Sequence, residues 1–216
     1  MKTLLWPAIT IVATIVLVGG HLAGIGWPAG VAKMVASTGF ILTGVAAGAA
    51  THRVGRIILA GLVLSWFGDL FLIGSGDTYF QLGLVSFLSG HVAYSAAFLA
   101  HGVRPGWVGA ALVPVLIIGA LVLNWLLPNV PADMLGPVWA YFVVITAMLL
   151  LAIGARGAGA PLILPLGAAC FYFSDISVAS GKFVPGDFPH YVWGLPLYFG
   201  GQLLIARAAG EARGVV

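Results

Sequence analysis

The stretch APLILPLGAACFYFSDISVAS, residues 160–180, is long enough to cross a membrane and carries one charged side chain, Asp175. A membrane-spanning helix needs about 20 predominantly apolar residues. Ionisable side chains inside such a helix are rare, face the interior of a helix bundle and usually serve a function. The stretch therefore predicts a membrane helix that contributes an acidic group to the interior of the protein.

The rest of the chain has the same apolar character. Its 216 residues are 61% hydrophobic and 7% charged, whereas soluble domains contain about 25% charged residues. Short breaks rich in glycine and proline separate eight apolar runs, which leaves no room for an extramembrane domain. We expect an all-α, polytopic membrane protein with a single integral membrane domain, residues 1–216. The eight expected transmembrane helices are 3–20, 29–50, 56–74, 80–101, 107–127, 134–154, 160–180 and 189–208.

The first run is interpreted as a helix and not as a signal peptide, because no small-x-small cleavage site follows it. Basic residues indicate the orientation, since loops that carry Lys and Arg stay in the cytoplasm. One side carries seven basic residues, and the other carries only Lys33 and Lys182. Both termini are therefore expected in the cytoplasm, and the short loops with frequent Ala, Gly and Arg favour a bacterial inner membrane. The seven residues are Lys2, Arg53, Arg56, Arg104, Arg156, Arg207 and Arg213.

Polar residues within the expected spans fall into one layer. At a helical rise of about 1.5 Å per residue, three of them lie about 7 Å below the non-cytoplasmic boundary, and three lie slightly deeper. This predicts a polar site in the outer-leaflet half of the bundle. The alternative for either acid is a structural ion pair with Lys33 or Lys182. The layer comprises Lys33, Asp69 and Asp175, with His91, Tyr198 and Gln202 beneath them.

Two parts of the chain resemble each other. SWFGDLFL (65–72) and FYFSDISV (171–178) both place an aromatic pair, a small residue and an aspartate in the same order, and each is followed by a similar helix. We hypothesise a tandem duplication of a four-helix unit, with halves 1–104 and 105–216. An even number of helices keeps both copies in the same orientation, so the pseudo-twofold axis lies along the membrane normal. This axis would place the two aspartates opposite each other across a central cavity.

Small residues and aromatic residues mark the expected helix contacts. Small-xxx-small pairs allow helices to approach closely in lipid, and the sequence offers two of them. Residues at steps of three and four lie on one face of a helix, which groups four side chains of the fourth span. For the aromatic members, packing between helices is an alternative to ligand contact, and for His91 the alternative is a core histidine bonded to a neighbouring carbonyl. The pairs are Gly44 with Gly48 and Ser86 with Gly90, and the face comprises Gly83, Phe87, His91 and Tyr94.

Four segments resemble the YhhN-like membrane family, the lysoplasmalogenases: GDLFL (68–72), GLVSFLSGHVAYSAAF (83–98), FSDISVASGKF (173–183) and LYFGGQLLIA (197–206). Lys33 also fits the family pattern, although Met34 stands where the family often has proline. The resemblance implies an eight-helix enzyme that hydrolyses the vinyl ether bond of lysoplasmalogens. Its products would be a fatty aldehyde and glycerophosphocholine or glycerophosphoethanolamine, and its partners would be the lysophospholipid substrate and the lipid bilayer.

This chemistry suits a pair of acids. Vinyl ether hydrolysis begins with protonation of an alkene carbon, and water then adds to the resulting oxocarbenium ion. Two carboxyl groups in one poorly solvated site cannot both ionise cheaply, and glycosidases use such a pair for a similar transition state. We expect one aspartate to donate the proton and the other to stabilise the cation and activate water. The sequence does not assign these two roles to particular aspartates. The catalytic candidates are Asp69, Asp175 and His91, and the substrate-binding candidates are Lys33, Lys182, Tyr94, Tyr198 and Gln202.

Two other functions remain as alternatives. A metal-dependent hydrolase needs three or four ligands, but only His91 lies well inside the spans and no HxxH or HxxxH pair exists; no metal or other cofactor is expected. A proton-coupled transporter would share duplicated halves and intramembrane acids, yet the polar layer is confined to one side. The net charge of +3 is small and dispersed, so no nucleic-acid partner is expected. The sequence leaves the oligomeric state, the head group and the chain length open.

Overall fold

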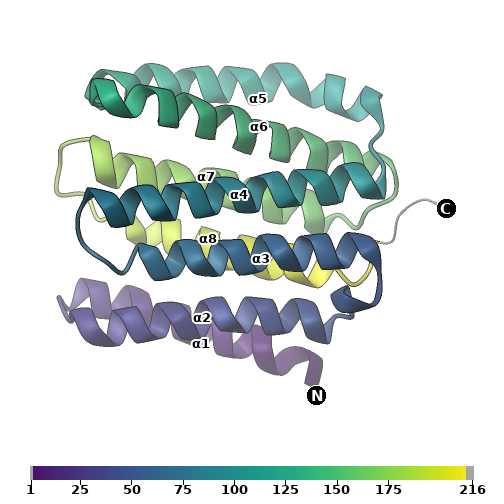
Figure 1. The fold of residues 1–216 in the computed structure, drawn as a ribbon, viewed down its shortest axis with the longest axis horizontal. Helices are drawn as coiled ribbons and strands as arrows, with labels where there is room; N and C mark the ends of the chain where they lie inside the picture. The colour runs from purple at the N-terminus through teal and green to yellow at the C-terminus, as the bar shows by residue number, and fades with distance from the viewer. Residues whose placement is uncertain (1, 213–216) are drawn as a thin grey trace.

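The computed structural model describes residues 2–212, except the side chains of residues 2, 3, 27 and 28. Within these residues the protein is all-helical, as expected, with eight long helices (Figure 1) and three short 3-10 helices, η1 Ala49–Thr51, η2 Leu127–Asn129 and η3 Ala132–Met134. The long helices are α1 Lys2–Leu22, α2 Gly26–Ala46, α3 Arg53–Phe71, α4 Asp77–His101, α5 Pro105–Leu126, α6 Leu135–Gly157, α7 Ile163–Phe183 and α8 Tyr191–Ala208.

The first seven long helices are each long and apolar enough to cross a membrane. The protein is therefore a multi-pass membrane protein. The eighth, α8, was also predicted as a span but is less apolar, because it contains Pro196, Gln202 and Arg207. It lies alongside the other helices (Figure 1) and packs against α7, with further contacts to α1, α2 and α3. Since neighbouring helices cover much of α8, it can carry polar groups that a lipid-facing helix would not tolerate.

The helices are arranged in layers. In Figure 1, α5 and α6 lie at one side, α4 and α7 come next, α3 and α8 follow, and α1 and α2 lie at the other side. The largest contacts between helices are those of α3 with α4, α7 with α8, and α1 with α2. The helices that carry Asp69 and Asp175, α3 and α7, thus occupy the two central layers, where neighbours surround them.

Glycines permit the close packing of these central helices. A Cβ atom at Gly68 would lie 2.6 Å from the Phe87 ring, and one at Gly61 would meet the Tyr94 ring, so the α4 aromatic rings lie directly on the α3 backbone. The predicted Ser86–Gly90 pair also faces α3. The other predicted pair is wrong in one member, because α2 ends at Ala46 and Gly48 follows it in a left-handed conformation with φ 91°, which glycine adopts without strain.

The α3–α4 contact gives a first prediction, on stability. Gly61→Ala forces the Tyr94 ring to move, and overpacking of this kind costs about 1–3 kcal/mol. We expect a lower midpoint of thermal unfolding in detergent micelles, by several degrees. The matched control is Gly109→Ala on α5, where an added Cβ has no neighbouring atom within 4 Å. Equal midpoints for the two variants would contradict this view of the α3–α4 contact.

Basic residues mark one end of the bundle, where the links from α2 to α3, α4 to α5 and α6 to α7 lie. Arg53, Arg104 and Arg156 are at this end, and Arg207 is in the last turn of α8. Arg213 lies outside the described residues, and the Lys2 side chain is not described. The cytoplasmic orientation, the bacterial inner membrane and the duplication into two halves stay predictions.

Candidate active site

A cavity of about 520 Å³ lies within the bundle and is lined by residues from α2 to α8. This volume is in the range of about 300–1,000 Å³ that is common for ligand pockets. Both predicted acids, Asp69 and Asp175, line it, together with Lys33 and Tyr198. The remaining lining is mostly apolar, so the structure brings the two carboxyl groups into one largely apolar chamber.

Asp69 is the more enclosed acid, with its side chain 2% exposed. Its Oδ2 accepts hydrogen bonds from the Ser37 hydroxyl at 2.6 Å and the Tyr198 hydroxyl at 2.7 Å. The Lys33 ammonium lies 3.7 Å from Oδ1, so Asp69 has the lysine partner that the ion-pair alternative predicted, and a purely structural role of this pair stays an alternative. Burial opposes ionisation of this carboxyl group, whereas the two hydroxyl donors and the ammonium group stabilise its charged form.

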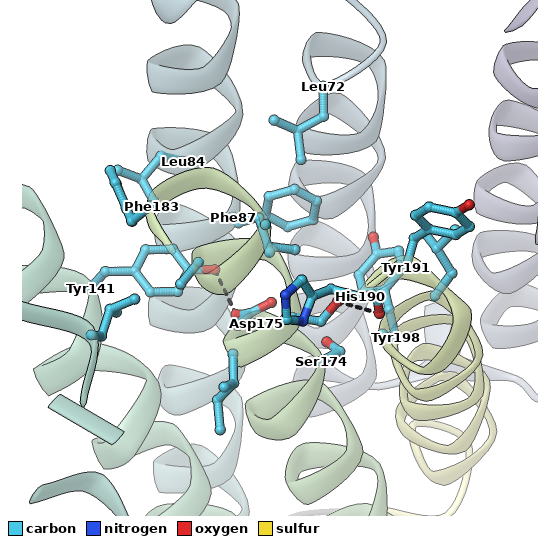
Figure 2. Close-up of a pocket in the computed structure, with 18 of the residues that line it drawn as sticks. Leu72, Leu84, Phe87, Tyr141, Ser174, Asp175, Phe183, His190, Tyr191 and Tyr198 are labelled. Carbon is cyan, nitrogen blue, oxygen red and sulfur yellow. Dashed lines mark hydrogen bonds between the residues drawn. The ribbon is translucent and has the colours of Figure 1, made fainter. Parts of the chain in front are cut away.

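Asp175 occupies the middle of the cavity and is more accessible, with 15% of its side chain exposed. Its Oδ2 accepts a hydrogen bond from the Tyr141 hydroxyl at 2.7 Å, drawn in Figure 2, and lies 3.1 Å from Nε2 of His91. Its Oδ1 has no hydrogen bond to any described residue. No lysine or arginine of the described part of the chain pairs with this carboxyl group, so it has one oxygen available to a ligand.

His91 is fully buried beside Asp175 and does not line the cavity. Besides contacting the acid, its Nε2 is 2.9 Å from the Tyr141 hydroxyl, and its Nδ1 is 3.3 Å from the Met148 sulfur. The ring also packs against Phe171, with 4.5 Å between centroids. These contacts place His91 where it can orient the Asp175 carboxyl group, and its part in catalysis stays a prediction.

The predicted substrate-binding residues separate into two groups. Lys33 and Tyr198 line the cavity, whereas Tyr94 and Gln202 lie behind it. Tyr94 donates a 2.7 Å hydrogen bond to Gln202, whose amide nitrogen is 3.5 Å from the Tyr198 hydroxyl. These two residues therefore support the hydroxyl group that contacts Asp69, and direct contact between them and a substrate stays a prediction.

Lys182 is also away from the cavity lining. Its ammonium group lies 2.9 Å from an Asp77 carboxylate oxygen and 4.8 Å from the centre of the Phe80 ring. These contacts join the end of α7 to the start of α4. A role of Lys182 in phosphate binding stays a prediction, since the structure gives this residue a different partner.

Sequence reasoning missed three contributors to the site. Tyr141 sits in the apolar α6, where a tyrosine is indistinguishable from ordinary aromatic packing. Ser37 follows Lys33 by one helical turn, and this i,i+4 spacing was the available signal. His190 lies in the loop before α8, lines the cavity, and accepts a 2.8 Å hydrogen bond from Ser177 through its carbonyl oxygen.

No cluster of three or more His, Cys, Asp and Glu residues that could hold a metal ion forms among the described residues.

Comparison with known proteins gives the family. The YhhN family matches residues 28–209. The chain belongs to the YhhN family. The matched region runs from α2 to just beyond α8, so it contains every residue that lines the cavity, while α1 lies outside it. No solved structure matches the chain significantly.

Curated relatives of this YhhN protein carry related names. It is 33% identical to the lysoplasmalogenase TMEM86A of Bos taurus over 76% of this chain and 69% of that protein. It is likewise 33% identical to the Homo sapiens TMEM86A, over 75% and 68% of the two chains. A lysoplasmalogenase of Mycobacterium tuberculosis is 36% identical over 66% of this chain and 57% of its own length.

Proposed function

We propose that this YhhN protein is a lysoplasmalogenase, an enzyme that hydrolyses the vinyl ether bond of a lysoplasmalogen to a fatty aldehyde and a glycerophospho head group. The observation that carries the proposal is the pair of aspartates with different surroundings in one apolar cavity. The names of its relatives support the substrate class. A cavity inside a membrane bundle also suits a substrate that resides in the bilayer.

Asp175 is the proton donor in this proposal. It has an unengaged carboxyl oxygen that a substrate in the cavity can reach, and it has no lysine or arginine partner among the described residues. Its proton goes to the alkene carbon remote from the ether oxygen. The carbon next to the oxygen then becomes an oxocarbenium ion, and Asp175 is left as a carboxylate.

Asp69 is the stabilising anion. Its two hydroxyl donors and the Lys33 ammonium stabilise its carboxylate form and are in place before the cation forms. Little reorganisation is therefore needed when charge develops, which is the basis of electrostatic catalysis. Water adds to the cationic carbon and returns a proton to Asp175, as the acid of a retaining glycosidase acts first as acid and then as base. The resulting hemiacetal collapses to the aldehyde and frees the glycerol hydroxyl.

The decisive experiment compares two substrates. Purified protein is incubated in H₂¹⁸O with a lysoplasmalogen and with the 1-acyl lysophospholipid of the same head group and chain length. We expect aldehyde from the first, no fatty acid from the second, and no heavy oxygen in the glycerophospho product. Fatty acid without aldehyde would make the protein an ester-cleaving lipase. Transport of an intact substrate into vesicles without aldehyde release would favour the transporter.

Tyr141→Phe tests the group that contacts Asp175. The substitution keeps the ring and removes one hydrogen bond to a carboxyl group, worth about 1.5–3 kcal/mol when the partner is charged. We expect kcat for aldehyde release to fall by about 10- to 100-fold, with KM nearly unchanged. The matched control is Tyr79→Phe, because Tyr79 is exposed, lies outside the cavity lining and has no hydrogen bond to either acid. Similar losses in both variants would remove the special role of Tyr141.

A further inference from the structure

The cavity has an apolar wall on one side of Asp175. Figure 2 shows Tyr141 and Phe183 on one side of this carboxyl group, and His190 and Tyr191 on the other. On the Tyr141 side, α5, α6 and α7 contribute apolar side chains, whereas the lysine and the histidine of the lining come from α2 and the loop before α8. We call the apolar side the chain wall, formed by Val122, Leu123, Leu126, Phe142, Ile145 and Tyr172.

We propose that the chain wall binds the aliphatic chain of the lysophospholipid and that the Gly119–Phe142 contact limits the chain length accepted. This inference rests on the proposed function for the identity of the ligand. Apolar burial is worth about 25 cal/mol per Å², but a chain that leaves lipid gains little from apolar surface alone. Selectivity between chains therefore depends on how the wall is shaped, and shape is set by packing.

Gly119 controls the position of the Phe142 ring. A Cβ atom at Gly119 would lie 2.5 Å from Cζ of Phe142 and 3.3 Å from the Tyr172 hydroxyl. The Phe142 ring thus lies against the bare α5 backbone, while Trp139 packs on it edge-to-face with 6.1 Å between centroids. Phe142 also lines the cavity, so with α5 and Trp139 on two sides of the ring we expect an added methyl group to push the ring towards the cavity. A methyl group at position 119 is therefore expected to reduce the space in the cavity beside the chain wall.

The test uses binding and not cleavage. Affinities of 1-O-alkyl lysophosphocholines with 12 to 18 chain carbons, which have no vinyl ether to hydrolyse, are measured at one fixed detergent concentration. Comparing variants at that concentration cancels the partition of each lipid into the micelle. For Gly119→Ala we expect the affinity ratio of the 18-carbon to the 12-carbon lipid to fall by about tenfold, the lower range for a pocket that distinguishes a methylene.

Two further variants make the result specific. Gly109→Ala, on the same helix but with open space around the added Cβ, should leave the ratio unchanged. Gly119→Ala combined with Phe142→Leu should restore it, because the smaller side chain accommodates the methyl group. Three results would refute the proposed role of the chain wall. These are an equal change in affinity at all chain lengths, a changed affinity ratio in Gly109→Ala, and an affinity ratio that the double variant does not restore. A shifted ratio in a protein that releases no aldehyde would instead retain the wall and reject the proposed function.

Discussion

Asp175→Asn is expected to reduce kcat for aldehyde release by about a thousandfold or more. General acid catalysis contributes about 10²–10⁴-fold, and the variant also lacks the carboxylate that would accept the proton from water. Asparagine keeps the size of the side chain and an oxygen that can accept from Tyr141 and His91. It has no acidic proton to transfer to carbon. The rate of aldehyde release at saturating substrate measures the effect, and an unchanged midpoint of thermal unfolding shows that the fold is retained.

Two observations accompany this result. In D₂O the wild-type aldehyde should carry one deuterium on the carbon next to the carbonyl, and kcat should fall because proton transfer to carbon limits the rate. Asp77→Asn is the matched control, since this exposed acid pairs with Lys182 outside the cavity, and its kcat should match that of the wild type. An Asp175→Asn protein with near wild-type kcat would refute the assignment of the acid.

The fold was predictable because lipid leaves few choices. A backbone that crosses a bilayer must satisfy its hydrogen bonds internally, so long apolar runs become helices. The span expected at 160–180 is observed as α7 Ile163–Phe183, and the span expected at 80–101 as α4 Asp77–His101. Helix ends were less predictable, as the early end of α2 shows, because one glycine conformation decides them.

The acids of the site were predictable for the same reason. A carboxyl group such as that of Asp69 or Asp175 is conspicuous in an apolar helix, because its burial is expensive. Neutral hydroxyl groups give no such signal. The tyrosine that contacts Asp175 and the serine that contacts Asp69 became visible only when the helices were packed. Lys182 was conspicuous as well, yet its surface pairing with Asp77 depends on how the end of α7 meets the start of α4.

The contacts of the two acids also support the proposed duplication. Asp69 on α3 is contacted from α2 and α8, and Asp175 on α7 is contacted from α6 and α4. In a tandem pair of four-helix units, α2 corresponds to α6 and α8 corresponds to α4. Each acid thus receives its partners from equivalent helices. The partners of Asp69 are a lysine, a serine and a tyrosine, and those of Asp175 are a tyrosine and a histidine. Such divergence would have turned two equivalent carboxyl groups into an anion and an acid.

Asp69→Asn tests the proposed role of Asp69 as the stabilising anion. We expect kcat to fall by about 100- to 1,000-fold, which corresponds to about 3–4 kcal/mol of transition-state stabilisation. The variant removes the anion beside the cationic intermediate and leaves the Lys33 ammonium without its carboxylate. A positive charge then faces the developing oxocarbenium ion. The Lys33 side chain is 13% exposed, so the unpaired charge is poorly hydrated and should also lower the midpoint of thermal unfolding.

The double variant Lys33→Met with Asp69→Asn separates these two effects. Removing the unpaired ammonium should bring the unfolding midpoint back towards that of the wild type, because no uncompensated buried charge remains. The rate of aldehyde release should stay low, because the anion is still missing. Recovery of the rate together with the midpoint would mean that Asp69 only neutralises Lys33. Recovery of the midpoint alone would mean that the carboxylate acts on the reaction, since a purely structural ion pair has no reason to limit kcat once the fold is restored.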